Sequence, residues 1–209
     1  MRKIKRKSIV PVLLVLFITM IFPASSQAYG ILKTNDNSAY ISGLHENSIT
    51  FQSWNGFSQE TRWAIDYASR QWNNRTGHTK LYHSATQHNA GNIISVEDGK
   101  NLITKAILTG SDYEDTLMLT SYYYGWYETK WQIYEADIVV DSTWRWYNNG
   151  SANGFDVQNV MTHEFGHMLG LDEEYTQKEA TMYEKSSPGE TKKRDLHQDD
   201  LNGFFAIYG

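Results

Sequence analysis

The sequence contains no cysteine and only three prolines among its 209 residues. Without cysteine the chain can form no disulfide bond, no thiolate nucleophile and no cysteine-ligated metal site. An exported form must therefore rely on its core, and on any bound metal, for stability. Long apolar runs are also scarce. The one clear run covers residues 9–22, which is shorter than the roughly 20 residues that a helix needs to cross a bilayer.

The start of the chain has the three parts of a secretory signal peptide. Residues 1–7 carry five Lys or Arg and no acid, residues 9–22 are nearly all apolar, and Ser26-Gln27-Ala28 offers small residues for cleavage. We expect residues 1–28 to be removed and the protein to be secreted into the extracellular space. An uncleaved membrane anchor is the alternative, but the short apolar run argues against stable membrane insertion.

Basic residues are in short supply in the rest of the chain. Residues 29–209 contain 14 of the 19 Lys and Arg and all 24 Asp and Glu, so their formal charge is 14 − 24 = −10. That charge argues against nucleic acid or an anionic membrane as a partner. The remaining 181 residues (209 − 28) are enough for one domain with a substantial core and too few for two. We expect a single domain over residues 29–209, and a monomer.

Short runs of alternating apolar and polar residues predict one β-sheet. The alternation of Ile49 and Phe51 with polar neighbours predicts a strand over residues 48–53. Four more strands are expected over residues 80–83, 92–96, 117–124 and 133–140. After the last of them, the Asn- and Gly-rich residues 148–154 predict a flexible connection.

Three helices are expected around this sheet, which predicts an α/β or α+β domain. The first follows Ser58, a good N-cap, and ends before Gly77. Its apolar residues recur at spacings of three and four and should lie on the sheet as one stripe: Trp63, Ala64, Tyr67, Ala68 and Trp72. The second should run from near Asp156 to Leu169. The third should start at Gln198 and place on one face Leu201, Phe204, Phe205 and Tyr208.

The segment His163-Glu164-Phe165-Gly166-His167 lies in the second expected helix and carries the strongest chemical signal. Residues four apart on a helix lie about one turn from each other, so both imidazoles project from the same side and can bind one metal ion. Glu164 lies beside them, where its carboxylate can take a proton from a water molecule that a zinc ion activates. The pattern predicts a zinc hydrolase with His163 and His167 as ligands and Glu164 as general base.

A third ligand is expected just after this helix. Gly170 can take the left-handed conformation that turns the chain sharply and brings a later residue back towards the metal. Glu173 is the favoured ligand, and its neighbours Asp172 and Glu174 are the alternatives. A solvated acidic turn beside an incomplete metal site is the remaining interpretation.

Further segments support one family. They are residues 135–140, residues 155–160, Ala180-Thr181-Met182-Tyr183 and residues 199–209. With these segments and the helix motif extended through Gly170 and Glu173, the last third of the chain resembles the matrixins, the metzincin family that includes the matrix metalloproteinases, and above all their short bacterial relatives. The resemblance implies an α/β metzincin fold, with a twisted, mostly parallel five-stranded sheet, an antiparallel edge strand, two long helices and a C-terminal helix. Met182 would form the Met-turn beneath the zinc site.

The resemblance also implies a zinc-dependent endopeptidase with one catalytic zinc ion and a protein or peptide substrate. An extended peptide would pair with the edge strand over residues 117–124, where the expected contacts are Leu117, Leu119, Ser121 and Tyr123. Side-chain preference would come from a pocket bounded by the zinc helix and residues 183–191. A Ca²⁺ site is compatible with such a fold, but the sequence gives no support for one.

The sequence departs from the matrixin pattern in three respects. Glu173 stands where matrixins have a histidine, which would add a negative charge to the metal centre. The chain has no cysteine that could cap the zinc, so inhibition of the enzyme by a cysteine bound to the metal is excluded. His78, His83 and His88 do not match the context of the family's second, structural zinc, and we expect surface or hydrogen-bonded residues there.

The sequence leaves three functions other than a general peptidase open. A non-catalytic exported binding module could keep the metzincin scaffold with an incomplete zinc site, but Glu164 would have no use in it. The dense aromatic residues over 122–134 could form a carbohydrate platform, but aromatic residues favour strands and cover sheet faces, so we expect packing. A toxin or processing enzyme with a narrow substrate range would also fit the sequence.

Overall fold

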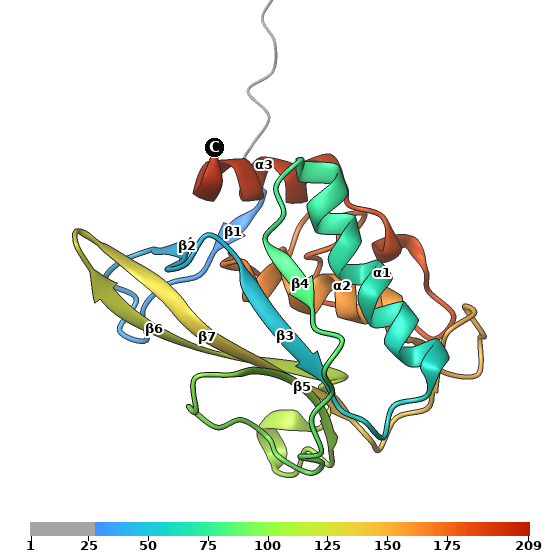
Figure 1. Cartoon of the computed structure of the whole chain (residues 1–209). Helices are drawn as coiled ribbons and strands as arrows, with labels where there is room; N and C mark the ends of the chain where they lie inside the picture. Colours follow the sequence, from blue (N-terminus) through green and yellow to red (C-terminus); the bar gives the residue numbers. More distant parts are fainter. Residues whose placement is uncertain (1–27) are drawn as a thin grey trace, which may run out of the picture.

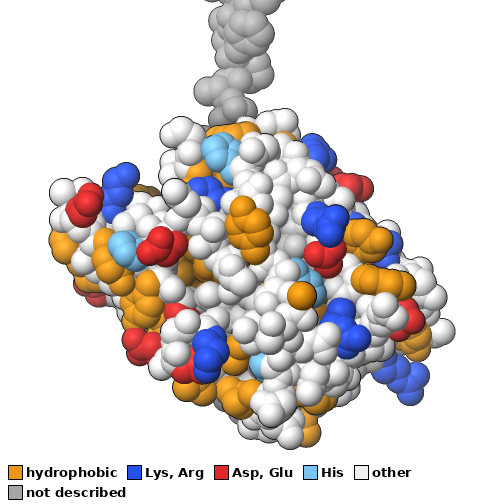
Figure 2. Space-filling model, in the orientation of Figure 1, with side chains coloured by type: hydrophobic (Ala, Val, Ile, Leu, Met, Phe, Trp, Pro, Cys, Tyr) orange, Lys and Arg blue, Asp and Glu red, His pale blue; other side chains and the backbone are white. Residues whose placement is uncertain are grey.

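The computed structural model describes residues 28–209, which form one sheet with two long helices packed against it (Figure 1). The expected signal peptide lies, except for Ala28, outside the described residues. No helix within residues 28–209 is long and apolar enough to cross a membrane. Figure 2 shows acidic, basic and apolar side chains interspersed over one face of the molecule.

Six strands form the main sheet: five lie in the order β4-β3-β5-β7-β6, and the short β2 (Ile41–Leu44) also pairs with β7. Their bounds are β3, Ile49–Ser53; β4, Leu81–His83; β5, Asn101–Ala106; β6, Met118–Tyr127; and β7, Lys130–Asp141. All neighbours are parallel except β6, which is antiparallel to β7 and forms the edge. The expectation of a mostly parallel five-stranded sheet with an antiparallel edge strand is therefore confirmed.

Two strands lie where the apolar pattern predicts none, and one expected strand is wrong. β5 lies after residues 92–96, which are irregular. The buried carboxylate of Asp137 accepts the N–H groups of Val96 (3.2 Å) and Leu102 (2.8 Å). At Val96 the Asp137 side chain thus binds a backbone N–H that would otherwise pair with a neighbouring strand. The other unexpected strand, β2 (Ile41–Leu44), lies parallel to β7 on the same side as β5, because β6 occupies the other side.

The three expected helices are present: α1, Gln59–Thr76; α2, Val157–Met168; and α3, Gln198–Tyr208. Oγ of Ser58 accepts the Thr61 N–H (3.2 Å), and Gly77 follows α1 with a φ of 72°, as the sequence predicts. Short elements complete the chain: β1, Gly30–Ile31; β8, Trp146–Tyr147; β9, Phe155–Asp156; β10, Leu171–Asp172; and 3₁₀ turns at Ser111–Tyr113 and Lys192–Arg194.

The expected apolar stripe of α1 is wrong in part. Ile65 and Trp72 are fully buried, but Trp63 and Tyr67 are 53% and 56% exposed. Trp63 and Trp72 are nine residues apart, which is about two and a half helical turns, so the two indoles lie on opposite sides of the helix. In α3, likewise, Phe205 is 43% exposed rather than part of the buried face.

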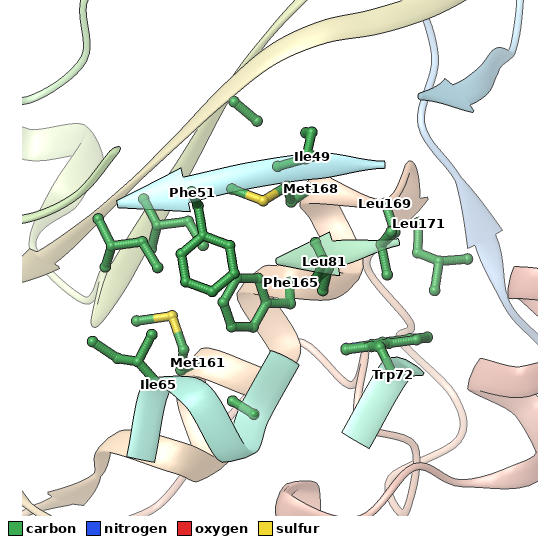
Figure 3. Packing of buried hydrophobic residues seen from close by; sticks show 14 of the residues in the cluster. Ile49, Phe51, Ile65, Trp72, Leu81, Met161, Phe165, Met168, Leu169 and Leu171 are labelled. Carbon is green, nitrogen blue, oxygen red and sulfur yellow. The ribbon is translucent and has the colours of Figure 1, made fainter. Parts of the chain in front are cut away.

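The strands β3 and β4 share one apolar core with α1 and α2 (Figure 3). Phe51 of β3 packs on Phe165 of α2, with 5.0 Å between the ring centroids. The indole N–H of Trp72 in α1 donates to the Thr162 carbonyl of α2 (2.8 Å). These contacts fix α2 against the sheet. Since residues two apart on a helix point in nearly opposite directions, the side of α2 away from Phe165 carries residues 163 and 167.

Candidate metal centre

Two imidazoles meet on α2 at the positions that the sequence predicts. His163 and His167 lie one turn apart, and their Nε2 atoms are 3.1 Å from each other. Oε1 of Glu173 lies 3.3 Å from each of these nitrogens. Within residues 28–209, these three side chains are the one group of three or more His, Asp or Glu residues placed to hold a metal ion.

The sequence around α2 explains how Glu173 returns to the helix. The helix begins after Asp156, whose Oδ1 accepts the Asn159 N–H (3.0 Å) as an N-cap. It ends at Met168 with Leu169 as the C-cap, and Gly170 follows with a φ of 98°, a left-handed conformation that favours glycine. The chain therefore turns sharply and runs back past the histidines.

The turn that carries Glu173 is held by a segment from the other end of the described chain. β10 pairs antiparallel with β1, and the Leu32 N–H donates to the Gly170 carbonyl (2.9 Å). A Cβ added to Gly30 would lie 2.8 Å from Cβ of Asp172, so this close pairing depends on glycine. The position of the third carboxylate thus depends on contacts between residues far apart in the sequence.

The neighbouring carboxylates have other partners. Glu174 is almost fully buried, and its Oε1 accepts the N–H groups of Thr176 (2.5 Å) and Gln177 (2.7 Å). Oδ1 of Asp172 accepts the Glu173 N–H (2.8 Å). Of the three candidates for the third ligand, Glu173 is the one that the structure brings to the histidine pair.

Backbone carbonyls orient both imidazoles. Nδ1 of His163 lies 2.9 Å from the Thr181 carbonyl, and Nδ1 of His167 lies 2.9 Å from the Leu171 carbonyl. A carbonyl oxygen only accepts, so each Nδ1 carries a proton and donates it. In a neutral ring this leaves Nε2 with the lone pair that can bind a metal ion.

The second oxygen of Glu173 also fits a cation. Oε2 is buried and has no hydrogen-bond partner, although Oε1 lies between the two imidazoles. A buried carboxylate oxygen without a partner is costly unless a donor or a cation satisfies it. Two imidazole nitrogens and a carboxylate are a donor set that Zn²⁺ accepts in hydrolases. The residues present therefore fit a zinc ion.

Without a bound metal ion, the charged forms of His167 and Glu173 stabilise each other. Burial works against charge on His167, but the hydrogen bond to Glu173 and the charges of Glu164 and Glu173 outweigh it and raise the pKa of His167 to about 9. Burial also opposes ionisation of Glu173, but the two imidazoles outweigh it and hold the pKa of that carboxyl group well below its usual value. The metal-free protein thus keeps a cation and an anion at this site.

Zinc uptake at pH 7.5 is therefore expected to release a proton. Because the pKa of His167 is raised from 6.5 to about 9, its protonated form stabilises the metal-free fold below pH 6.5, and this contribution is lost as the pH rises through 9. Nε2 must lose that proton before it can bind the ion. Calorimetric titration with Zn²⁺ in buffers of different ionisation enthalpy should give about one proton per ion at pH 7.5 and fewer at pH 10. An equal count at both pH values would contradict the raised pKa.

Met182 lies directly beneath the zinc helix. Its side chain is 2% exposed, and a Cβ added to Gly166 would lie 2.1 Å from the Met182 Sδ. The N–H groups of Thr181 (2.9 Å) and Met182 (3.0 Å) donate to the carboxylate of Asp200 in α3. The segment that resembles a Met-turn is thereby fixed against α2, and the glycine at position 166 allows the close approach.

Replacing Gly166 with alanine is expected to destabilise the protein by about 1–3 kcal/mol, the usual cost of overpacking a core. The added methyl group would displace the Met182 sulfur, and the better helix propensity of alanine offsets this only in part. Urea unfolding of the zinc-loaded protein measures the change. Met182→Ala in the same chain should relieve the overlap, so the double variant should lose less stability than the two single variants together. Simple additivity would argue against this contact.

Glu164 contacts the edge strand of the sheet. Its side chain is buried, and Oε2 accepts a hydrogen bond from the Thr120 hydroxyl of β6 (2.7 Å). Sequence reasoning missed Thr120 as a site residue. The one signal for it is its place in the expected edge strand, since nothing in the sequence says which face of that strand meets α2.

Alternate side chains of β6 face opposite ways. Thr120 points to α2, whereas Leu119 packs in a small apolar cluster on the other face. Ser121 and Tyr123, which the sequence also assigned to substrate, share the face of Leu119, and Leu117 lies just before the strand. Within the described residues β7 is the one strand paired with β6, so its other edge is available for the backbone of a peptide.

A cavity of about 670 Å³ opens next to the ligand set. Its wall includes His163, Glu164 and Glu173 together with residues 184–187 and Lys193. It lies between the zinc helix and the chain after Met182, where the sequence placed a specificity pocket. Lys193 was not among the residues picked from the sequence.

The three remaining candidate histidines do not gather around a common point. Nε2 of His83 lies 3.0 Å from Ser53 Oγ, and Nε2 of His88 lies 3.0 Å from the Ile103 carbonyl. His78 packs against aromatic rings of α3. Each ring is thus engaged in separate hydrogen bonds or packing.

The part of the chain that contains the sheet and the candidate site is similar to known proteins. Residues 48–209 match the sequence model of the matrixin family. Metalloendoproteinase 1-MMP of Arabidopsis thaliana is 46% identical over 54 residues, which are 26% of this chain and 14% of that protein. Matrix metalloproteinase-27 of Homo sapiens is 38% identical over 74 residues (35% and 14%), and neutrophil collagenase of Homo sapiens is 40% identical over 75 residues (36% and 15%). The matches span only about 14–15% of the length of these relatives.

The family match extends well beyond those short stretches. It begins just before β3 and includes the whole sheet except β2, all three helices and the segment around Met182. The arrangement of the five strands and the helix motif agree with it. The chain therefore belongs to the matrixin family of metzincin metalloproteases.

Proposed function

We propose that this protein is a secreted zinc-dependent endopeptidase. In this proposal His163, His167 and Glu173 hold one zinc ion, and Glu164 is the general base. The observation that carries it is the convergence of two Nε2 atoms and Oε1 of the carboxylate, with separations of 3.1–3.3 Å, on the helix that also carries Glu164. Membership of the matrixin family supports metalloprotease chemistry in general.

The protein groups around the ion have distinct roles in peptide hydrolysis. A bound zinc ion supplies Lewis acidity, which polarises the carbonyl of the scissile bond and makes water easier to deprotonate. Glu164 takes a proton from the attacking water and passes it to the leaving amine. The Thr120 hydroxyl donates to Oε2 of Glu164 (2.7 Å) and thereby orients the carboxylate. The free edge of β6 binds the backbone of an extended peptide.

Secretion is supported by the sequence. Residues 1–28 carry a basic start, an apolar stretch and small residues for cleavage, the pattern of a secretory signal peptide. The substrates are then extracellular proteins or peptides, and the protein acts as a monomer.

Zinc content and peptide cleavage test this proposal together. Purified protein covering residues 29–209 should contain one zinc ion per chain, cleave casein or members of a diverse peptide library, and lose this activity when a chelator removes the metal. Re-addition of Zn²⁺ should restore it. Zinc retention with no cleavage of any library member would instead support a non-catalytic binding module.

A further inference from the structure

Lys193 is a buried cation with few partners. It is 1% exposed, although lysine is almost never fully buried unless it is paired. Its Nζ donates one hydrogen bond, to the Tyr183 carbonyl. Within residues 28–209, no carboxylate oxygen lies within 4.0 Å of Nζ. An ammonium has three donors, so two of them have no partner in the described protein.

The backbone on either side of Lys193 is firmly held. The Lys193 N–H donates to Oδ1 of Asn159 in α2 (2.8 Å), and the Asn159 amide donates to Oε1 of Glu190 (3.3 Å). Next to it, Nε of Arg194 donates to the buried carboxylate of Asp156 (2.8 Å). The backbone at Lys193 is therefore held in place, and its side chain is buried.

The lysine lines the same cavity as the catalytic residues. The wall of the cavity includes His163, Glu164 and Lys193, and it is mixed in character: its apolar residues are Leu117, Met118, Phe155, Val160 and Trp144. A substrate side chain that enters this cavity would meet both apolar groups and an ammonium with unused donors.

We propose that Lys193 makes this protein select substrates with an acidic side chain, glutamate above all, at a residue next to the scissile bond. The inference rests on the proposed peptidase function. Glutamate fits because its methylene groups can pack on the apolar residues of the wall and its carboxylate can accept the unused donors. Such a charge-assisted hydrogen bond is stronger than a neutral one, and it would offset the cost of keeping a buried ammonium unpaired.

The other charged residues of the cavity have contacts of their own or lie in solvent; Glu164 accepts a hydrogen bond from the Thr120 hydroxyl (2.7 Å). Glu184 pairs with Lys185 (3.3 Å), and Asp115 is exposed to solvent. Glu173 lies against the histidines. Burial lowers the pKa of Lys193, and the negative charges of Glu190, Glu173 and Glu164 act in the opposite direction. A substrate carboxylate would favour the charged amine further.

Matched peptides test the preference. Fluorogenic peptides of one sequence, with Glu, Gln or Leu at each residue flanking the scissile bond in turn, are compared by kcat/KM with the zinc-loaded protein. At one of the two positions, Glu should exceed Leu by about tenfold or more, with Gln between them. No advantage for Glu at either position would overturn the inference.

Variants of Lys193 separate specificity from structure. Lys193→Met should abolish or invert the ratio of kcat/KM values for the Glu and Leu peptides, and Lys193→Arg should retain it. Zinc content and the urea midpoint show whether each variant is folded. Lys193→Gln, which keeps a donor for the Tyr183 carbonyl without the charge, gives the same comparison if the methionine variant does not fold. A Glu preference that survives in the neutral variants would also overturn the inference.

Binding separates this inference from the peptidase function. Titration calorimetry with the zinc-loaded Glu164→Gln protein measures the affinity for the same peptides without cleavage. Tighter binding of the Glu peptide that is lost when Lys193→Met is added would support the role of Lys193. This holds even if the unchanged protein cleaves no peptide, a result that would contradict the peptidase function alone. Cleavage and binding with no Glu preference would leave the peptidase function intact and remove the role of Lys193.

Discussion

Replacing Glu164 with alanine is expected to leave one zinc ion bound per chain and to lower kcat by about 10²- to 10⁴-fold, the contribution usual for a general base. The metal should stay because the proposed ligands are His163, His167 and Glu173, which do not need the Glu164 side chain to hold their geometry. Metal analysis of the purified variant and kcat for a fluorogenic peptide measure the two effects separately.

Thr120→Val provides a graded comparison for this variant. It removes the hydroxyl that contacts Oε2 of Glu164 (2.7 Å) and keeps the shape of the side chain and the carboxylate itself. We expect a loss of activity well below that of Glu164→Ala, with unchanged zinc content. A Glu164→Ala protein that cleaves peptides at the original rate would refute the proposed mechanism.

Replacing Glu173 with alanine is expected to weaken zinc binding by about 10²-fold or more. Loss of a residue that merely orients a metal ligand costs about 10- to 100-fold in affinity, and Glu173 is proposed as a ligand itself. Its Oε1 lies 3.3 Å from both Nε2 atoms. Within residues 28–209, no other carboxylate of the turn forms a metal-ligand group with these histidines. Competition with a chromogenic chelator gives the affinity.

Two further variants make the assignment of the third ligand specific. Asp172→Ala removes the adjacent carboxylate, which accepts a backbone N–H (2.8 Å), and should change zinc affinity far less. Glu173→His supplies the imidazole that matrixins have at this position and should retain zinc. A large loss of zinc in Asp172→Ala together with none in Glu173→Ala would assign the ligand to Asp172.

Local signals predicted the helices well because each signal acts within a few residues. Ser58 and Gly77 mark the ends of α1 as an N-cap and a left-handed C-cap, and Asp156 caps α2. The apolar side of α1 was less well predicted. Each apolar residue from Trp63 to Trp72 is three or four residues from another one. The side chains nevertheless point in gradually changing directions around the helix, so the rings of Trp63 and Trp72 lie on opposite sides.

The sheet was harder to predict where long-range contacts decide it. Residues 92–96 have strand-like alternation, but Asp137 takes up a backbone donor of that segment, and the sheet uses Asn101–Ala106 instead. No pattern within residues 92–96 predicts that a side chain of β7, Asp137, will bind their backbone. The short strand at Ile41–Leu44 was missed for the same reason, because its partner is the distant Trp131–Ile133 part of β7.

The candidate site divides in the same way. The spacing of His163, Glu164 and His167 follows from helix geometry alone. The choice among three consecutive carboxylates depends on the turn after Gly170 and on which of them the neighbouring backbone occupies, and the sequence does not contain that information in local form. Thr120 and Lys193 come from segments distant in sequence, so only the assembled fold brings them to the cavity.

The pairing of β1 with β10 has a consequence for the order of assembly. Gly30 lies opposite Asp172, so the turn with the last proposed ligand closes only when a segment made early meets one made late. A chain made from its N-terminus therefore has both imidazoles in place before the turn with Glu173 can pair with β1. If the proposed zinc site is right, tight binding of the ion would follow that pairing.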